Sequence, residues 1–322
     1  MKILFFLIFN FLFFFYINSF ISRRLNLYDF PTYNKIHKKK TPLTGGFYFI
    51  VIIFFNIIFF NTNQLTALKT IYILLPFIFL FIIGFYDDKI KILSSTRIIL
   101  IFFLLLLFFS LDNYLILNEI KIFLKNSYFY KKTNTLVLTT LCAITIIILI
   151  NLIDGIDGLA ISFVINWFLT LILFYNYDFK QNYIFFLACL IFLYFNLTKK
   201  IFLGSSGNMI LSFFITKESI IIYNQNSEVD LMSISLIFFI PFLDSIRLFF
   251  SRIFNKKSPF QRDLKHLHHY LYKSYKNYTI VIYNLLIFIS VALYNIYKVN
   301  IFLCYASLLL LYITFLIKAK AQ

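Results

Sequence analysis

Long apolar runs recur along the whole chain and constrain its fold more than any other feature. A helix that crosses a bilayer needs about 20 mainly apolar residues, and runs of this kind follow one another here. Since 61% of the 322 residues are hydrophobic and only 13% are charged, the chain is too apolar for an ordinary soluble globule. We therefore expect an all-α, polytopic membrane protein that forms a single membrane-embedded domain over residues 1–322.

About eleven spans fit this pattern. Their approximate bounds are 3–21, 46–61, 69–86, 97–111, 135–152, 159–175, 182–197, 207–223, 231–250, 278–296 and 299–316. The first run lacks a small-residue cleavage pattern and is followed by basic residues, so we expect it to be a retained helix. The span 207–223 is the weakest, because Lys217 and Glu218 interrupt it and adjacent helical residues do not face each other.

The basic residues predict how the spans are oriented. Of the 30 Lys and Arg residues, 20 fall in loops on one side of the membrane and 8 on the other, and Lys217 and Arg247 lie within spans. Short loops rich in Lys and Arg stay in the cytoplasm. This places the N-terminus outside and the C-terminus in the cytoplasm. It also attributes the net charge of +17 to cytoplasmic loops and anionic headgroups, so that no nucleic-acid partner is expected.

Polar chemistry gathers on the predicted cytoplasmic side. All 7 glycines and all 4 histidines lie at or near the cytoplasmic ends of spans, as do most aspartates. One cytoplasmic site explains this better than a pore, which needs polar groups at mid-depth. The loops expected to form it are approximately 22–45, 87–96, 152–158, 198–206 and 251–277. The three cysteines lie in apolar runs without CxxC spacing and indicate neither a metal site nor a disulfide.

The stretch Asn151–Ala160 carries two carboxylates between apolar runs. An aspartate at the centre of a membrane helix costs roughly 2.5–3.5 kcal/mol, so the pair needs a water-exposed edge or a function. Asp154 and Asp157 are three residues apart and share a face in any near-helical turn, while Gly155 leaves the backbone bare for a ligand. A polar turn between two helices is the simpler alternative.

Asp87 and Asp88 end the third span. Adjacent carboxylates repel each other by about 4 kcal/mol at 4 Å and an effective dielectric of 20, unless a cation or proton intervenes. If Asp154 and Asp157 converge on them, the four acids suit Mg²⁺, which one or two carboxylates and phosphate oxygens usually hold. A solvated acidic helix end is the alternative reading of Asp87 and Asp88 alone.

Basic and donor groups gather in the loop Arg252–His269, which ends in His266-Leu267-His268-His269. Arginine, lysine and histidine beside exposed backbone suit pyrophosphate, although a merely basic loop is the alternative. His266 and His269 share a helix face and His268 does not, which argues against a zinc site of three histidines.

Three weaker signals complete the set. Gly204 and Gly207 precede a helix N-terminus, where an anion can bind. The first loop carries Lys35, His37, Gly45 and Gly46, which alone indicate a basic juxtamembrane segment. Asp244 lies three residues before Arg247, so a structural salt bridge is as good an interpretation as a ligand site.

Taken together, these residues resemble the polyprenyl-phosphate N-acetylhexosamine-1-phosphate transferases of glycosyltransferase family 4. The match runs from Asp29 to His269, with Asp87-Asp88, Asn151–Ala160, Pro241–Asp244 and Ser258–His269 as its strongest pieces. The resemblance implies transfer of a sugar-1-phosphate from a UDP-sugar to a membrane polyprenyl phosphate, with release of UMP. It implies Mg²⁺ as the divalent ion, with Mn²⁺ as an alternative.

Within that family, the ending His266–His269 preceded by Ser258-Pro259-Phe260 is similar to the UDP-N-acetylglucosamine branch. The runner-up is the phospho-MurNAc-pentapeptide branch, which shows three consecutive histidines followed by Phe-Glu. Three positions depart from the family: Ser205 stands where an aspartate on the metal is expected, Ile148 where an asparagine is expected, and Asn34 where an arginine is expected.

The resemblance assigns roles to the polar residues of the motifs. The residues expected to act in catalysis and to hold the metal are Asp87, Asp88, Asp154 and Asp157. Those expected to bind substrate are Lys35, His37, Gly45, Gly46, Lys89, Arg97, Asn151, Gly204, Gly207, Asp244, Arg252, Arg262, Asp263, His266, His268 and His269.

The expected partners are a UDP-N-acetylhexosamine, undecaprenyl phosphate and membrane lipids, with a homodimer as one option. The expected location is the bacterial inner membrane, with the active site facing the cytoplasm. A non-catalytic homologue that binds polyprenyl phosphate is the main rival, motivated by Ser205. A transporter is a further alternative, and it is disfavoured because the sequence lacks internal repeats and mid-membrane polar residues.

Overall fold

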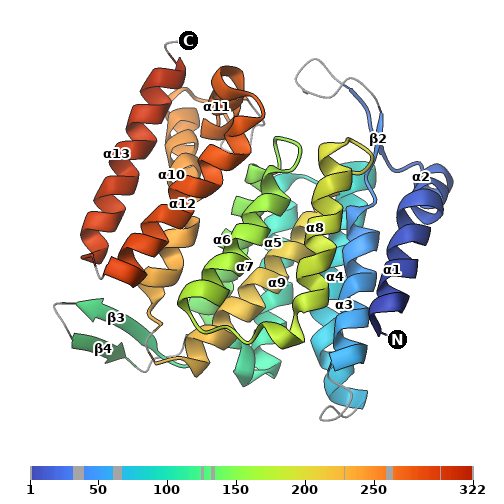
Figure 1. The fold of residues 1–322 in the computed structure, drawn as a ribbon, viewed down its shortest axis with the longest axis horizontal. Helices are drawn as coiled ribbons and strands as arrows, with labels where there is room; N and C mark the ends of the chain where they lie inside the picture. The colour runs from blue at the N-terminus through green and yellow to red at the C-terminus, as the bar shows by residue number, and fades with distance from the viewer. Residues whose placement is uncertain are drawn as a thin grey trace. The chain divides into compact units, whose positions relative to one another are not determined.

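The computed structural model describes residues 2–31, 40–60, 67–124, 127–131, 135–227, 229–258, 264–297 and 299–320 (Figure 1). Two compact units emerge. Unit 1 comprises residues 1–104 and 178–214, and unit 2 comprises residues 105–177 and 215–322. The expectation of a single domain over residues 1–322 stays a prediction.

Unit 1 is built from helices that follow the predicted apolar runs. They are α1 (Lys2–Leu12), the π-helix η1 (Phe13–Ile17), α2 (Asn18–Leu25), α3 (Gly45–Phe60), α4 (Ala67–Ile90), α8 (Tyr183–Leu197), the short η3 (Phe179–Gln181) and the first parts of α5 (Ser94–Leu111) and α9 (Gly204–Gln225). Two short strands, β1 (Tyr28–Asp29) and β2 (Thr41–Pro42), pair antiparallel between α2 and α3.

The core of unit 1 is aromatic, and its few polar groups bond to one another. Phe14 stacks on Phe195 with ring centroids 3.9 Å apart, which joins η1 to α8. Tyr48 of α3 is fully buried, and its hydroxyl donates to Asn10 Oδ1 at 2.6 Å. A buried polar group without a partner is costly, so this bond allows the polar side chains to lie inside an apolar bundle.

Close backbone packing joins three helix ends in unit 1. A Cβ atom added at Gly84 of α4 would lie 2.6 Å from the backbone nitrogen of Ser206, and one added at Gly45 of α3 would lie 2.6 Å from Cα of Leu203. Real Cβ atoms do not approach backbone so closely. The glycines therefore let α3, the end of α4 and the start of α9 meet at backbone distance.

Unit 2 contains the remaining helices. They are the end of α5, η2 (Asn113–Leu115), α6 (Leu136–Ile153), α7 (Leu159–Phe174), the end of α9, α10 (Leu231–Phe254), α11 (Leu267–Tyr275), α12 (Tyr278–Tyr297) and α13 (Ile301–Lys320). Helix α12 packs against α7, α10 and α13, and α10 also packs against α6. Buried Asp230 caps α10, because its carboxylate accepts from the backbone nitrogen of Ser233 at 2.6 Å.

A small hairpin corrects the expectation of a purely helical chain. Strands β3 (Ile120–Leu124) and β4 (Ser127–Lys131) pair antiparallel in the segment predicted to be an outer loop. Lys121 anchors the hairpin to α9, since its Nζ donates to the carbonyl oxygens of Tyr223 at 3.0 Å and Asn226 at 3.3 Å. The fold is thus nearly all-α, with two two-stranded sheets in the part of the chain that is described.

The helices agree in part with the predicted spans. Among the described residues, 7 helices are long and apolar enough to cross a membrane, and the apolar helices Gly45–Ile58, Leu159–Phe174 and Tyr183–Leu197 are shorter. Each of the eleven predicted runs coincides with a helix, whereas eleven crossings and the orientation of the termini stay predictions.

One argument about the run 207–223 was wrong. Lys217 and Glu218 do meet, because Lys217 Nζ lies 2.7 Å from Glu218 Oε1. Their long side chains bend toward each other around the helix, although their Cβ atoms point in different directions. Helix α9 thus carries a neutralised pair at the position where the sequence is interrupted.

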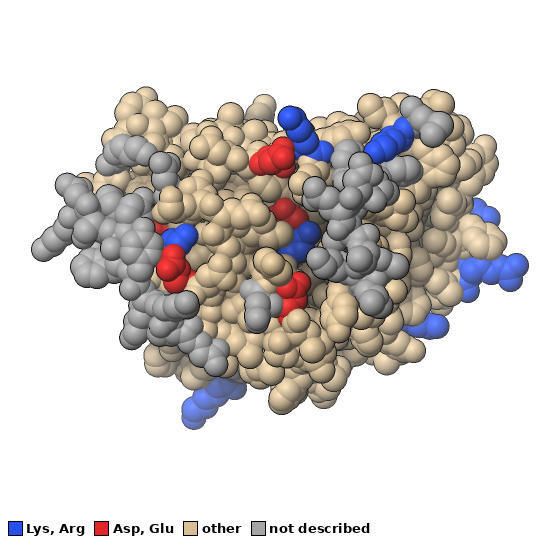
Figure 2. Space-filling view, turned by 90° about the horizontal axis from the view of Figure 1, so that it is seen from below, with Lys and Arg blue, Asp and Glu red and all other residues tan. Residues whose placement is uncertain are grey.

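The surface has the character of a protein surrounded by lipid. Figure 2 shows one face, on which a few charged side chains lie in a mainly uncharged surface. Large apolar side chains are exposed on several helices, among them Leu4 (62%), Phe103 (64%) and Leu310 (64%). Soluble monomers rarely expose extended apolar surface, so these faces are expected to contact lipid.

Replacing Gly84 by Ala is expected to lower the free energy of unfolding by about 1–3 kcal/mol, the range for overpacking, since its Cβ would press on the backbone of α9. The apparent Tm of the detergent-solubilised protein measures this. Ser95→Ala, at an exposed position of α5, is the control and should change stability by less than about 0.5 kcal/mol. Equal apparent Tm values for the two variants would contradict the close approach of α4 and α9.

Candidate active site

The two adjacent aspartates of α4 hold the start of α9 in unit 1. Asp88 accepts hydrogen bonds from the backbone nitrogen of Ser205 at 2.6 Å and from that of Ser206 at 3.1 Å. The Ser206 hydroxyl also donates to Asp88 Oδ2 at 2.8 Å. A carboxylate at this position satisfies free N–H groups and complements the helix dipole. Asp88 therefore caps α9 from a different helix.

Asp87 has different partners from its neighbour. Its Oδ2 lies 2.5 Å from Arg97 Nη1 of α5 and also accepts from the Ser205 hydroxyl at 2.5 Å. Within the described part of the chain, Asp87 Oδ1 accepts no hydrogen bond from a side chain or a backbone group. The guanidinium and the helix N-terminus offset the repulsion between the two carboxylates that the sequence predicts.

The predicted glycines of unit 1 all lie beside this cluster. Gly204 has φ of +69°, a conformation that favours glycine, and a Cβ there would lie 2.7 Å from Asp88 Oδ2. Gly45, Gly46 and Gly207 contact the backbone or side chains of residues 202–207 and of one another. Packing thus accounts for these glycines, while the substrate contacts expected of them stay predictions.

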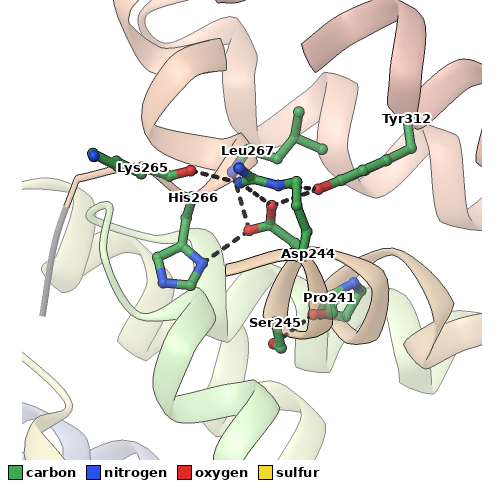
Figure 3. A network of polar contacts seen from close by, with 8 residues as sticks. Pro241, Asp244, Ser245, Lys265, His266, Leu267 and Tyr312 are labelled. Carbon is green, nitrogen blue, oxygen red and sulfur yellow. Dashed lines mark hydrogen bonds and ion pairs between the residues drawn. The ribbon is translucent and has the colours of Figure 1, made fainter. Parts of the chain in front are cut away.

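Asp244 of α10 is the centre of a second polar network, in unit 2 (Figure 3). Arg247 Nη2 donates to its Oδ1 at 2.8 Å, and the Tyr312 hydroxyl donates to the same oxygen at 2.9 Å. Oδ2 lies 2.9 Å from His266 Nδ1 and accepts from the backbone nitrogen of Leu267 at 3.0 Å. The salt bridge between Asp244 and Arg247, one of the two interpretations of this pair, is present.

The three histidines lie together, which corrects the helix-face argument. Helix α11 begins at Leu267, and His266 precedes it in an extended conformation with ψ of 152°. The ring of His266 stacks on that of His268, with ring centroids 5.3 Å apart. The ring centroids of His268 and His269 lie 4.3 Å apart. The prediction that His268 is separated from the other two was wrong because His266 is outside the helix.

The histidines contact the turn that carries Asp154 and Asp157. A Cβ atom at Gly155 would lie 2.6 Å from His268 Nε2 and 2.8 Å from His269 Cε1. Helix α6 ends at Ile153, and α7 begins after Gly158, whose φ is +84°. Both carboxylates are therefore in a tight turn between two helices and are partly exposed. Two motifs about 110 residues apart in sequence thus form one local surface.

His268 is a buried imidazole with an unpartnered ring nitrogen among the described residues. Its side chain is 2% exposed, and its Nε2 has no hydrogen-bond partner among the described residues. Burial lowers the pKa of His268 well below its usual value, and the neighbouring imidazoles of His269 and His266 lower it further. We therefore expect a neutral imidazole near pH 7.

The predicted four-acid metal site is divided between the two units. Asp87 and Asp88 belong to unit 1, and Asp154 and Asp157 belong to unit 2. Across the described ranges, no group of three or more His, Cys, Asp or Glu side chains is arranged to hold a metal ion. Convergence of the four carboxylates about one ion stays a prediction.

Of the remaining predicted site residues, three lie on helices and four lie outside the described residues. Lys89 is exposed near the end of α4, Asn151 is partly buried in the last turns of α6, and Arg252 lies in the last turn of α10. The predicted substrate ligands that lie outside the described residues are Lys35, His37, Arg262 and Asp263.

Tyr312 of α13 was missed by the sequence analysis. It bonds both Asp244 and Arg247, whose Nε donates to the Tyr312 hydroxyl at 2.7 Å. No sequence signal points to it, because it is one of 23 tyrosines and lies in an apolar run more than 40 residues after the nearest motif.

Comparison with known proteins gives two related matches. The model of glycosyl transferase family 4 matches residues 70–223, which include all four predicted catalytic aspartates. An undecaprenyl-phosphate alpha-N-acetylglucosaminyl 1-phosphate transferase from Thermotoga maritima is 26% identical over 258 residues, covering 78% of this chain and 75% of the relative. Both comparisons support a relationship of this chain to glycosyl transferase family 4.

The match to the model of glycosyl transferase family 4 and the similarity to this relative support the resemblance drawn from the motifs. The matched range contains the aspartates Asp87 and Asp88 and the Asp154–Asp157 turn, and it ends before Asp244 and the histidines. The second network is therefore supported by its geometry and by the motifs around it.

Replacing Asp88 by Ala is expected to speed amide hydrogen exchange at Ser205 and Ser206 by about tenfold or more, because a hydrogen bond to a charged acceptor contributes about 1.5–3 kcal/mol. Hydrogen exchange read by NMR or mass spectrometry measures this. Ser205→Ala, which removes only the hydroxyl bond to Asp87, is the matched control and should leave both amides protected. Unchanged exchange in Asp88→Ala would show that the carboxylate does not cap α9.

The lowered pKa of His268 predicts a loss of stability in acid. Between its folded pKa and the unfolded value of about 6.5, the unfolded chain binds more protons, so stability falls as the pH drops below that value. The apparent Tm is therefore expected to fall when the pH is lowered from 7.5 to 5.5, and His268→Gln should reduce this fall. An equal fall in both proteins would mean that His268 does not contribute.

Proposed function

We propose that this chain transfers N-acetylhexosamine-1-phosphate, with GlcNAc-1-phosphate as the first choice, from a UDP-sugar to undecaprenyl phosphate. UMP is the second product. The reaction would take place at the cytoplasmic face of a bacterial inner membrane and begin the synthesis of a lipid-linked cell-surface glycan. The match to the family model and the name of the Thermotoga maritima relative support the acceptor and the reaction class.

One observation carries this proposal furthest. In a chain that matches the family 4 model, the turn with Asp154 and Asp157 lies against His268 and His269, with the bare backbone of Gly155 between them. Carboxylates can hold a divalent ion, and an imidazole beside exposed backbone can donate to phosphate oxygens. A diphosphate-containing sugar nucleotide needs both kinds of group, because transfer of its phosphoryl group depends on positioning and charge neutralisation.

The residues present fit a magnesium ion of the usual kind. Asp154 and Asp157 supply hard oxygen donors in a partly exposed turn, and Mg²⁺ commonly takes one or two carboxylates and completes its shell with water and phosphate. These two residues would hold the ion against the diphosphate, where it would neutralise negative charge. Mn²⁺ is the alternative ion.

The adjacent aspartates of α4 divide their roles in this proposal. Both oxygens of Asp88 already accept hydrogen bonds from the start of α9. Asp87 is therefore the better choice to orient or deprotonate the lipid phosphate, since its contacts fall on Oδ2. Arg97 or Lys89 would attract the anionic headgroup.

The basic loop after α10 would bind the donor. Arg252 and Arg262 would contact phosphates as charged groups, while neutral His268 would use its unpartnered Nε2 as a hydrogen-bond partner. We favour N-acetylglucosamine as the sugar for two reasons. The name of the relative contains this sugar, and the motif His266–His269 resembles the branch that uses it. Phospho-MurNAc-pentapeptide is the alternative group.

A non-catalytic role is the second candidate, and Ser205 favours it. The family's expected acid is absent there, and the serine hydroxyl donates to Asp87. Under this alternative the chain binds polyprenyl phosphate without turnover, and Ser205→Asp would create or restore activity. Full activity of the wild type would exclude it.

Membranes or purified protein given UDP-N-acetylglucosamine, undecaprenyl phosphate and Mg²⁺ should release UMP. Asp154→Asn and Asp157→Asn should each lower kcat by about 100-fold or more, the scale for loss of one preorganised electrostatic group. Asp178→Asn, the same change at an exposed acid, is the control and should keep wild-type activity. Absence of UMP release with every UDP-N-acetylhexosamine tried would rule out the enzyme.

A further inference from the structure

The hydroxyl of Tyr312 uses both of its hydrogen-bonding functions inside the Asp244 network. It donates to Asp244 Oδ1 at 2.9 Å and accepts from Arg247 Nε at 2.7 Å (Figure 3). The side chain is 4% exposed. A buried hydroxyl that fills both roles fixes the orientation of its two neighbours, because neither can rotate without leaving a polar atom unpaired.

Asp244 depends on these donors to remain ionised within an apolar helix. Its two oxygens accept from Arg247, Tyr312, His266 and the backbone of Leu267. Two donors serve Oδ1 and two serve Oδ2. Removal of the Tyr312 hydroxyl leaves Oδ1 with Arg247 as its single donor. Because a buried carboxylate is costly without hydrogen bonds, the remaining donors are expected to shift toward it.

Arg247 extends the network to the chain that leads into α11. Its Nη2 donates both to Asp244 Oδ1 at 2.8 Å and to the carbonyl oxygen of Lys265 at 2.6 Å. Tyr312 accepts from Nε of the same planar guanidinium. The plane of Arg247, and with it the position of Lys265, is therefore set from α13.

Asp244 then sets the state of His266. A carboxylate that already accepts from a guanidinium and a backbone N–H is ionised, so His266 Nδ1 must donate to it. This bond places a proton on Nδ1 of His266 and fixes the orientation of the ring. The same carboxylate binds Leu267, the first residue of α11, two residues before His269.

We propose that Tyr312 is a positioning residue that acts through Asp244 and Arg247 to hold His266, His268 and His269 against the Gly155 turn. The inference rests on the proposed function, in which His268 and His269 bind the diphosphate of the UDP-sugar. It assigns the last helix of the chain a part in donor binding, although that helix lies outside the range matched by the family model.

The chain offers a matched control for the general packing of α13. Tyr305 lies on the same helix, and its hydroxyl donates to the carbonyl oxygen of Met232 of α10 at 2.7 Å. Tyr305→Phe therefore removes the hydrogen bonds to Met232 and to the Ser235 hydroxyl, between the same two helices, without touching Asp244. Differences between Tyr312→Phe and Tyr305→Phe report on the network around Asp244 and not on helix packing.

Steady-state UMP release tests the role in catalysis. In Tyr312→Phe the KM for the UDP-sugar should rise about tenfold, the size expected for a lost hydrogen bond to a charged group, while the KM for undecaprenyl phosphate changes by less than about twofold. Tyr305→Phe should leave both KM values close to those of the wild type. An equal rise in both variants, or no rise in Tyr312→Phe, would overturn the proposal.

A second readout does not depend on turnover. In protein labelled with ¹⁵N-histidine, the His266 ring should give the signals of a ring protonated at Nδ1 in the wild type and in Tyr305→Phe, and altered signals in Tyr312→Phe. Unaltered signals in Tyr312→Phe would overturn the positioning role. A wild type that releases no UMP would refute the proposed function alone, and the histidine spectra would still decide the role of Tyr312.

Arg247→Lys provides a second variant should Tyr312→Phe fail to fold. Lysine keeps the positive charge but cannot reach Asp244, Lys265 and Tyr312 together, because it lacks the planar fork. The same change in the His266 signals and the same rise in the KM for the UDP-sugar are expected. Wild-type values in both measurements would overturn the proposal.

Discussion

An ionised carboxylate inside an apolar helix must be surrounded by donors, and this constraint at Asp244 organises much of unit 2. Four donors meet its two oxygens. They come from α10 itself, from α13 and from the chain that leads into α11. Because the charge cannot be left without them, His266 and the start of α11, which carries His268 and His269, have a defined position. This position brings His268 and His269 against the Asp154–Asp157 turn.

The same physics operates in unit 1 with a different set of donors. Asp88 takes its hydrogen bonds from the N-terminus of α9, and Asp87 takes its own from Arg97 and Ser205. The helix ends can approach this closely because glycines lie at the contacts. Ser205 does more than occupy the place of a missing acid, since its hydroxyl donates to Asp87, which a carboxylate cannot do.

Much of the fold could be predicted from the sequence, because apolar runs of the right length leave few alternatives to membrane helices. The motifs predicted one site that joins Asp87, Asp154 and His268; the Gly155 turn does lie against His268, while convergence with Asp87 stays a prediction. What could not be predicted depended on the bounds of short elements and on side-chain reach. His266 was placed on a helix that begins one residue later, and the side chains of Lys217 and Glu218 bend toward each other. Tyr312 acts from a helix with no motif, so only the folded chain reveals it.

The central claim is that the charge of Asp244 positions the histidine segment. Amide hydrogen exchange at Leu267–Tyr270, compared between the wild type and Asp244→Asn, tests it most directly. An amide side chain cannot accept from all four donors, so exchange across the first turn of α11 should become about tenfold faster while the interior of α12 stays protected. Unchanged protection of that turn in Asp244→Asn would contradict the account.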